Sequence, residues 1–117
     1  MKQKTDRPYL LHILDAINAI EKFSKKKTFN TFCTDDYFQS AVIKKLEIIG
    51  EAAAHISKEL KIHTVEIPWR PIVGARNRLI HGYFAVDEEK VWKMIAVDIP
   101  VLKKQIESLL QTLGQEE

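Results

Sequence analysis

The stretch FQSAVIKKLEIIGEAAAHI, residues 38–56, decides the fold because its apolar residues recur at helical spacing along two sides. The main stripe consists of Phe38, Val42, Leu46, Ile49, Ala53, Ile56 and Leu60, and a shorter second stripe of Ala41, Ile48 and Ala52. These stripes predict a helix over about 35–60, with Thr34 as its N-cap and Asp35 and Asp36 suited to the helix dipole. A helix that is apolar on two sides is buried on two sides. In a chain of 117 residues, we expect the second side to meet another subunit.

The same periodicity predicts a helix before this stretch and another after it. The first runs over about 7–24, with Pro8 in its first turn, and a polar, lysine-rich connection follows. The later helix begins around Pro68 and Pro71 and ends at Gly82. One face of this later helix carries Trp69, Ile72, Val73, Arg76, Leu79 and Ile80.

A last helix begins after Asp87, which is suited to be its N-cap, and its apolar residues stay in phase across Pro100. This predicts one long helix that is kinked at the proline. Its stripe consists of Val91, Ile95, Ile99, Leu102, Ile106, Leu109 and Leu113. No segment shows the sustained alternation of a strand. The sequence therefore predicts an all-α, up-and-down bundle of four or five helices, formed by one domain over 1–117.

Composition excludes several classes of protein. The formal net charge is only +2, so the chain is not a uniformly basic nucleic-acid binder. Cys33 is the only cysteine, which rules out an internal disulfide and a site built from several thiolates, and fits a reducing, cytoplasmic setting. The first apolar stretch is broken by polar residues, so we expect neither a signal peptide nor a membrane span. The spacing of His12, His55 and His63 is not that of metal ligands, and we assign them no role.

Arg76 interrupts the apolar stripe of the helix that starts at Pro68. A guanidinium is almost never fully buried without a partner, so Arg76 either forms a structural ion pair or lines a cleft and awaits an anion. His81 lies five residues on, about 140° around a straight helix, and Asn77 shares a face with His81. A histidine near a helix end is more often a cap or a packed ring than a catalyst. Spacing alone leaves these alternatives open.

The segment RNRLIHGY, residues 76–83, resembles the R-x4-H-x-Y motif of HEPN ribonucleases, and more closely that of the HepT toxin family. The resemblance extends through AVIKKLEIIGEAA (41–53), EIPWRPIVGARN (66–77) and VDEEKVWKMIAVDIPVLKKQIE (86–107), in order and at matching spacing. Pro71 departs from the pattern, where a helix former is expected. The resemblance implies a metal-independent ribonuclease that needs no cofactor and works as a homodimer, with two motifs meeting in a cleft.

In chemical terms, the resemblance gives Arg76 and His81 the catalytic roles. The 2′-hydroxyl of RNA is the nucleophile, His81 transfers protons because its ordinary pKa is about 6.5, and Arg76 stabilises the phosphorane. Asn77 would orient His81 or the ribose, and Arg78 would bind flanking phosphates unless it is a solvated surface charge. Gly50 permits a close helix crossing, which would let Glu51 pair with Arg76; an ordinary exposed glutamate is the alternative.

The resemblance also implies a partner. In HepT-like, type VII toxin–antitoxin systems, a minimal nucleotidyltransferase antitoxin transfers AMP to the motif tyrosine, which is Tyr83 in this sequence. The modification would add bulk and phosphate charge beside Arg76 and His81 and so switch off the site. A tyrosine ring packed on the core is the plainer alternative for Tyr83.

Two rival functions remain open at this point. HEPN-like bundles also serve as non-catalytic nucleotide- or partner-binding subunits of nucleotidyltransferases, in which Arg76 would bind a nucleotide phosphate and His81 would only donate a hydrogen bond. The third possibility is an all-α dimerisation adaptor with Arg76 in a structural ion pair.

Overall fold

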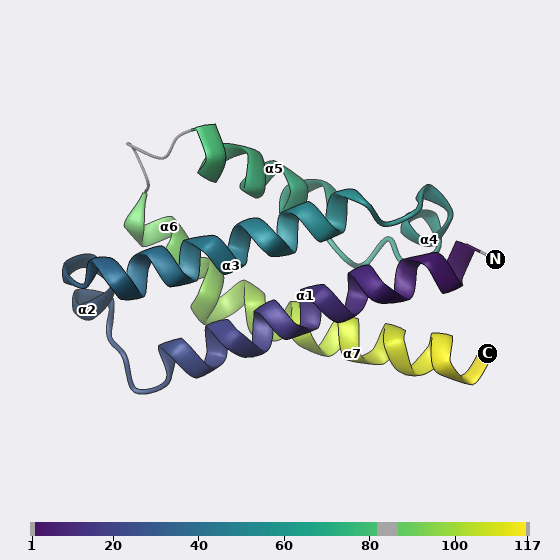
Figure 1. Cartoon of the computed structure of the whole chain (residues 1–117), viewed down its shortest axis with the longest axis horizontal. Helices are drawn as coiled ribbons and strands as arrows, with labels where there is room; N and C mark the ends of the chain where they lie inside the picture. The colour runs from purple at the N-terminus through teal and green to yellow at the C-terminus, as the bar shows by residue number, and fades with distance from the viewer. Residues whose placement is uncertain (1, 82–86, 117) are drawn as a thin grey trace.

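The chain forms an all-α bundle in which consecutive long helices run in alternating directions (Figure 1). The computed structural model describes the backbone of residues 2–81 and 87–116, and the side chains of residues 5–76 and 87–114. The helices are α1 (Lys2–Ser24), α2 (Phe29–Thr34), α3 (Asp36–Ala54), α4 (Lys58–His63), α5 (Trp69–His81), α6 (Glu88–Lys93), the π-helical segment η2 (Met94–Asp98) and α7 (Ile99–Glu116). The predicted all-α, up-and-down bundle is confirmed.

The core is built around α1, which packs against both α3 and α7, and α5 packs on the outer side of α3 (Figure 1). Leu10, Ile17, Val42 and Ile106 are fully buried in this core. Burying such side chains contributes roughly 1.5–3 kcal/mol each, which is the main favourable term in folding. The start of α1 and the end of α7 lie at the same end of the bundle (Figure 1).

The first helix begins earlier than predicted. It starts at Lys2 rather than Arg7, so Pro8 lies inside α1 and not in its first turn. The apolar pattern begins only at Leu10, and the polar residues before it carry no periodicity to read. Asp6 in this extension is 1% exposed, and its carboxylate accepts hydrogen bonds from the backbone N–H of Ser57 (2.8 Å) and from its hydroxyl (2.6 Å).

The predicted helix over 35–60 is two helices. Asp35, not Thr34, is the N-cap of α3, because its carboxylate accepts from the N–H of Phe38; Thr34 instead ends the short helix α2, which the sequence presented as a connection. After Ala54 the chain leaves the helix, and Ser57 caps α4 by accepting from the N–H of Leu60. A serine hydroxyl that bonds the next turn competes with continuation of the helix before it.

The second apolar side of α3 is partly covered within the chain. Ala52 is 7% exposed, and Ile48 packs against the core. Ala52 therefore needs no second subunit to cover it, whereas Ala41 and Ile48 are only partly buried. The expected contact of this face with another subunit stays a prediction.

The last helical stretch begins after Asp87, as predicted, and it is irregular near Pro100, where a kink was predicted. Asp87 caps α6 by accepting from the N–H of Lys90. The helix then passes through the π-helical segment, in which the N–H of Ile99 bonds the carbonyl of Met94, five residues back. Pro100 follows at once. Its ring clashes with the carbonyl four residues back in a regular α-helix, and the wider π turn relieves that clash. The axis changes direction between α6 and α7 (Figure 1).

Candidate functional site

The helices α3 and α5 approach each other closely at Gly50 and Arg76. A Cβ atom added to Gly50 would lie 2.1 Å from Cβ of Arg76 and 2.7 Å from its Cγ. No side chain larger than hydrogen fits there without moving one helix. The two helices are therefore close enough for the stem of Arg76 to pass directly over the backbone of α3.

From this crossing, Arg76 reaches the next residue of α3. Its Nη1 donates to Oε2 of Glu51 at 3.0 Å. The side chain of Arg76 is 23% exposed and that of Glu51 is 58% exposed, so the pair lies at the surface. Ion pairs this exposed contribute about 0–1 kcal/mol to stability. The pair orients the guanidinium more than it stabilises the fold.

The guanidinium is not saturated by Glu51. Its Nε is buried and has no hydrogen-bond partner among the side chains that the structure describes. Because this nitrogen is shielded from solvent, any anion that binds Arg76 must approach the exposed part of the guanidinium. The expectation that Arg76 awaits an anion stays a prediction.

His55, whose spacing in the sequence suggested no role, belongs to the same surface. It follows α3 as its C-cap, and its Nε2 lies 4.0 Å from Oε1 of Glu51. Its ring stacks on Tyr9 of α1, with centroids 5.1 Å apart and planes 12° apart. The spacing of four residues from Glu51 signals proximity on one helix. The contact with Tyr9 depends on how α1 crosses α3, and nothing in the local sequence signals it.

The motif residues lie on one helix with Arg76. Asn77, Arg78 and His81 belong to α5, but their side chains lie outside the described part of the structure, as do Gly82 and Tyr83 altogether. Five residues at about 1.5 Å each put the backbone of His81 roughly 7.5 Å farther along α5 than Arg76. The assigned roles of these four side chains stay predictions.

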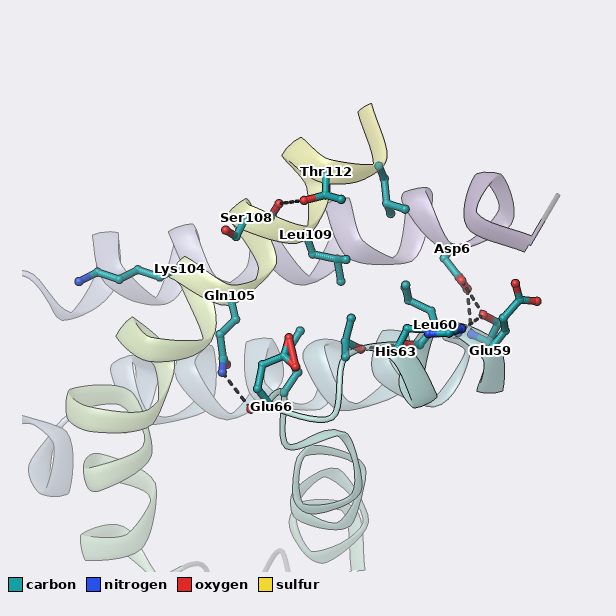
Figure 2. Close-up of a pocket in the computed structure, with 14 residues that line it drawn as sticks. Asp6, Glu59, Leu60, His63, Glu66, Lys104, Gln105, Ser108, Leu109 and Thr112 are labelled. Carbon is teal, nitrogen blue, oxygen red and sulfur yellow. Dashed lines mark hydrogen bonds between the residues drawn. The ribbon is translucent and has the colours of Figure 1, made fainter. Parts of the chain in front are cut away.

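A groove of about 670 Å³ lies elsewhere, between α4, the loop after it and the C-terminal half of α7 (Figure 2). Near one end, Asp6 bonds Ser57, and farther along Gln105 donates to the carbonyl of Glu66 at 3.0 Å. None of its lining residues belongs to the motif segment 76–83. This groove and the motif residues are thus separate places.

Cys33 lacks the features of an activated nucleophile. Partial burial raises the pKa of its thiol, and the negative charge and hydrogen bonding of Glu88 raise it further. A thiol with a raised pKa is protonated at neutral pH and reacts slowly.

Two further observations concern the described parts of the chain, residues 2–81 and 87–116. Among the side chains of residues 5–76 and 87–114, no group of three or more His, Cys, Asp or Glu lies together as a metal site would require. Their helices include none that is both long and apolar enough to cross a membrane.

The chain is similar to proteins named as ribonucleases. It is 43% identical to "Probable ribonuclease HepT" of Thermococcus cleftensis, over 92% of this chain and 97% of that protein. It is 40% identical to a "Putative RNase" of Caldanaerobacter subterraneus, over 92% and 96% of the two chains. A "Putative RNase" of Methanocaldococcus jannaschii is 36% identical, over 92% and 98%. No solved structure matches the chain significantly. The family model "Ribonuclease HepT-like" matches residues 13–109, most of the length, and the chain belongs to the HepT-like ribonuclease family.

Proposed function

We propose that this protein is a cytoplasmic, metal-independent endoribonuclease that cleaves RNA through its own 2′-hydroxyl. Membership of a ribonuclease family supports the reaction class. The observation that carries the proposal is the guanidinium of Arg76. Glu51 holds it at the surface beside a glycine crossing, on the helix that also contains His81.

In the proposed reaction, a base removes the proton of the 2′-hydroxyl, and the oxygen attacks the adjacent phosphorus. The 5′-oxygen leaves and takes a proton from an acid, which yields a 2′,3′-cyclic phosphate and a free 5′-hydroxyl. His81 performs proton transfer, and a positioned acid or base typically gives about 10²–10⁴-fold. Arg76 neutralises the charge that develops on the non-bridging oxygens. Asn77 orients His81 or the ribose, and Arg78 binds a flanking phosphate.

We further infer that two copies form the complete site. One chain has one motif histidine, whereas the reaction needs both an acid and a base. A two-fold dimer supplies a second His81, and the two histidines then share the roles. The cognate minimal nucleotidyltransferase antitoxin inactivates the site by transferring AMP from ATP to the hydroxyl of Tyr83, with release of pyrophosphate.

The test uses purified wild-type protein and three variants on total RNA. Arg76→Ala and His81→Ala are expected to lower the cleavage rate at least about 100-fold, because each removes a group that acts in the transition state. Arg70→Ala is the charge-matched control: Arg70 is exposed on the same helix, about 120° around from Arg76. It should cleave like the wild type. Circular dichroism checks that all four proteins are equally helical.

Equal nuclease activity in the wild type and His81→Ala would identify a contaminant and refute the enzyme. Nucleotide binding by a wild type that cuts no RNA would favour the rival, a non-catalytic subunit of a nucleotidyltransferase.

A further inference from the structure

His55 presents an aromatic surface beside the proposed phosphate-binding arginine. Its side chain is 55% exposed, although one face of the ring is covered by Tyr9. The exposed half therefore consists of the opposite face and the ring edge. Tyr9 lies on α1 and His55 follows the end of α3. We call this pair the Tyr9–His55 stack, and two helices hold it in place.

One carboxylate joins this stack to Arg76. Oε2 of Glu51 accepts from Nη1 of Arg76 at 3.0 Å, and Oε1 of the same group lies 4.0 Å from Nε2 of His55. The guanidinium and the imidazole thus flank a single carboxylate. A nucleotide whose phosphate meets Arg76 has its own base, or that of its neighbour, within reach of His55.

The stack and the motif histidine lie on opposite sides of Arg76. The helices α3 and α5 run in opposite directions (Figure 1). His55 follows Gly50 by five residues toward the C-terminal end of α3, and His81 follows Arg76 by five residues toward the other end. An RNA strand bound across Arg76 therefore has His81, the proposed proton-transfer residue, on one side and the Tyr9–His55 stack on the other.

The simplest alternative is a histidine that only caps α3, where a cation near the last carbonyls is favourable. A cap accounts for the position of His55 but not for a ring stacked flat on Tyr9 with its other face in solvent. Proteins that bind single-stranded RNA place a cation against the phosphate backbone and an aromatic face against the base. Arg76 and His55 offer this combination.

We propose that the Tyr9–His55 stack is a nucleobase subsite, on which the unpaired base next to the Arg76-bound phosphate stacks against the free face of His55. The subsite rests on the proposed ribonuclease function, because that function puts the phosphate at Arg76. It makes single-stranded RNA the preferred substrate, since a base in a duplex cannot present its face to the ring.

The direct test is NMR of the imidazole protons of His55, assigned by their loss in His55→Gln. A single-stranded oligoribonucleotide with 2′-O-methyl groups binds but has no free nucleophile. Adding it should move the His55 signals upfield through the ring current of the stacked base. A duplex of the same length should leave them unmoved. Unmoved His55 signals at saturating single strand would overturn the subsite, as would a shift with ATP but none with RNA.

The kinetic test separates stacking from other roles of the imidazole. His55→Ala should lower kcat/KM for single-stranded RNA by roughly 5- to 100-fold, through KM and not kcat, because the subsite binds without entering the chemistry. His55→Phe keeps an aromatic face and should retain most of the activity. His63→Ala, at an exposed position of α4, is the matched control and should match the wild type.

The outcomes distinguish this proposal from the ribonuclease itself. Cleavage by the wild type with equal KM in His55→Ala refutes the subsite and leaves the ribonuclease standing. An RNA-induced shift of His55 in a protein that cuts nothing refutes the ribonuclease and leaves the subsite standing. A His55→Phe variant as impaired as His55→Ala would show that the imidazole, and not a stacking face, is required.

Discussion

Arg76 occupies the space that a side chain on Gly50 would need. An added Cβ would lie 2.1 Å from Cβ of Arg76, well inside contact distance, so Gly50→Ala must push α5 away from α3. Alanine improves helix propensity by about 1 kcal/mol, but overpacking of a tight contact typically costs about 1–3 kcal/mol. We expect a net loss of stability and a displaced Arg76, measured as a lower denaturation midpoint together with lower RNA cleavage.

Gly114→Ala is the control for this prediction. Among the described residues, a Cβ there would meet Nη1 of Arg7 alone, at an ordinary 3.8 Å. The same substitution in α7 should be neutral or slightly stabilising. A stable and fully active Gly50→Ala would show that the crossing is not what positions Arg76.

The second prediction concerns Asp6, which ties α1 to the break between α3 and α4. Asp6→Asn removes one of two buried acceptors and turns an amide NH₂ toward the Ser57 hydrogen bonds. We expect a loss of about 1–3 kcal/mol in the free energy of unfolding, the usual effect of leaving a buried hydrogen-bonding group unsatisfied. Urea denaturation measures it. Asp15→Asn, at an exposed position of α1, is the control and should change the free energy of unfolding little. Equal denaturation midpoints for the two variants would show that the Asp6–Ser57 hydrogen bonds do not stabilise the fold.

The third prediction follows from the proposed nucleophile. Cleavage should persist in EDTA and leave a 2′,3′-cyclic phosphate or the 3′-phosphate formed from it. A single 2′-deoxyribose at the cut site should block the reaction there while other sites are still cut. Mass spectrometry of the fragments identifies the ends. Continued cutting at the deoxy position would exclude attack by the 2′-hydroxyl.

The fourth prediction is a homodimer with shared sites. Mixing an excess of His81→Ala with wild-type protein should lower the activity per wild-type chain if both histidines act in one site, whereas independent sites would lose nothing. Light scattering should give twice the chain mass of 13.5 kDa at assay concentration. An active monomer would disprove the shared site.

The fifth prediction concerns Tyr83, whose hydroxyl is the proposed acceptor of AMP. Tyr83→Phe should keep nuclease activity but escape inactivation by the partner nucleotidyltransferase and ATP. Mass spectrometry should find adenylate on the wild type and none on the variant. If the partner silences Tyr83→Phe without modifying it, inhibition works by binding and this role for Tyr83 is wrong.

The sequence predicted long helices well and their breaks poorly. Asp87 was identifiable because a capping residue preceded two acidic residues and an apolar stripe. The break at Ser57 was not, because Ile56 and Leu60 keep helical phase across it. Periodicity records which face is buried, not whether the chain stays helical between two buried residues. The short helix α2 was missed for a related reason: six residues are too few for a period to show.

The contact between Glu51 and Arg76 could be predicted from the sequence because a glycine inside a helix is an unusual residue with a specific meaning. A glycine inside a helix suggested a close crossing, and its neighbour Glu51 was a candidate partner for Arg76; the structure brings the two together. His55 carried no such signal. Its stacking partner Tyr9 is 46 positions away in the chain, and only the packing of α1 on α3 makes them neighbours.

The π-helical segment before Pro100 also links the length of the last helix to the proline. A π turn holds one residue more than an α turn, and residues 96–98 within it are exposed, between the buried Ile95 and Ile99. Deleting one of these three would convert the segment to regular α-helix and leave Ile95 and Ile99 three apart, still on one face, but the Pro100 ring would then clash with the carbonyl four residues back. Related chains that are one residue shorter at this turn are therefore expected to lack the proline as well.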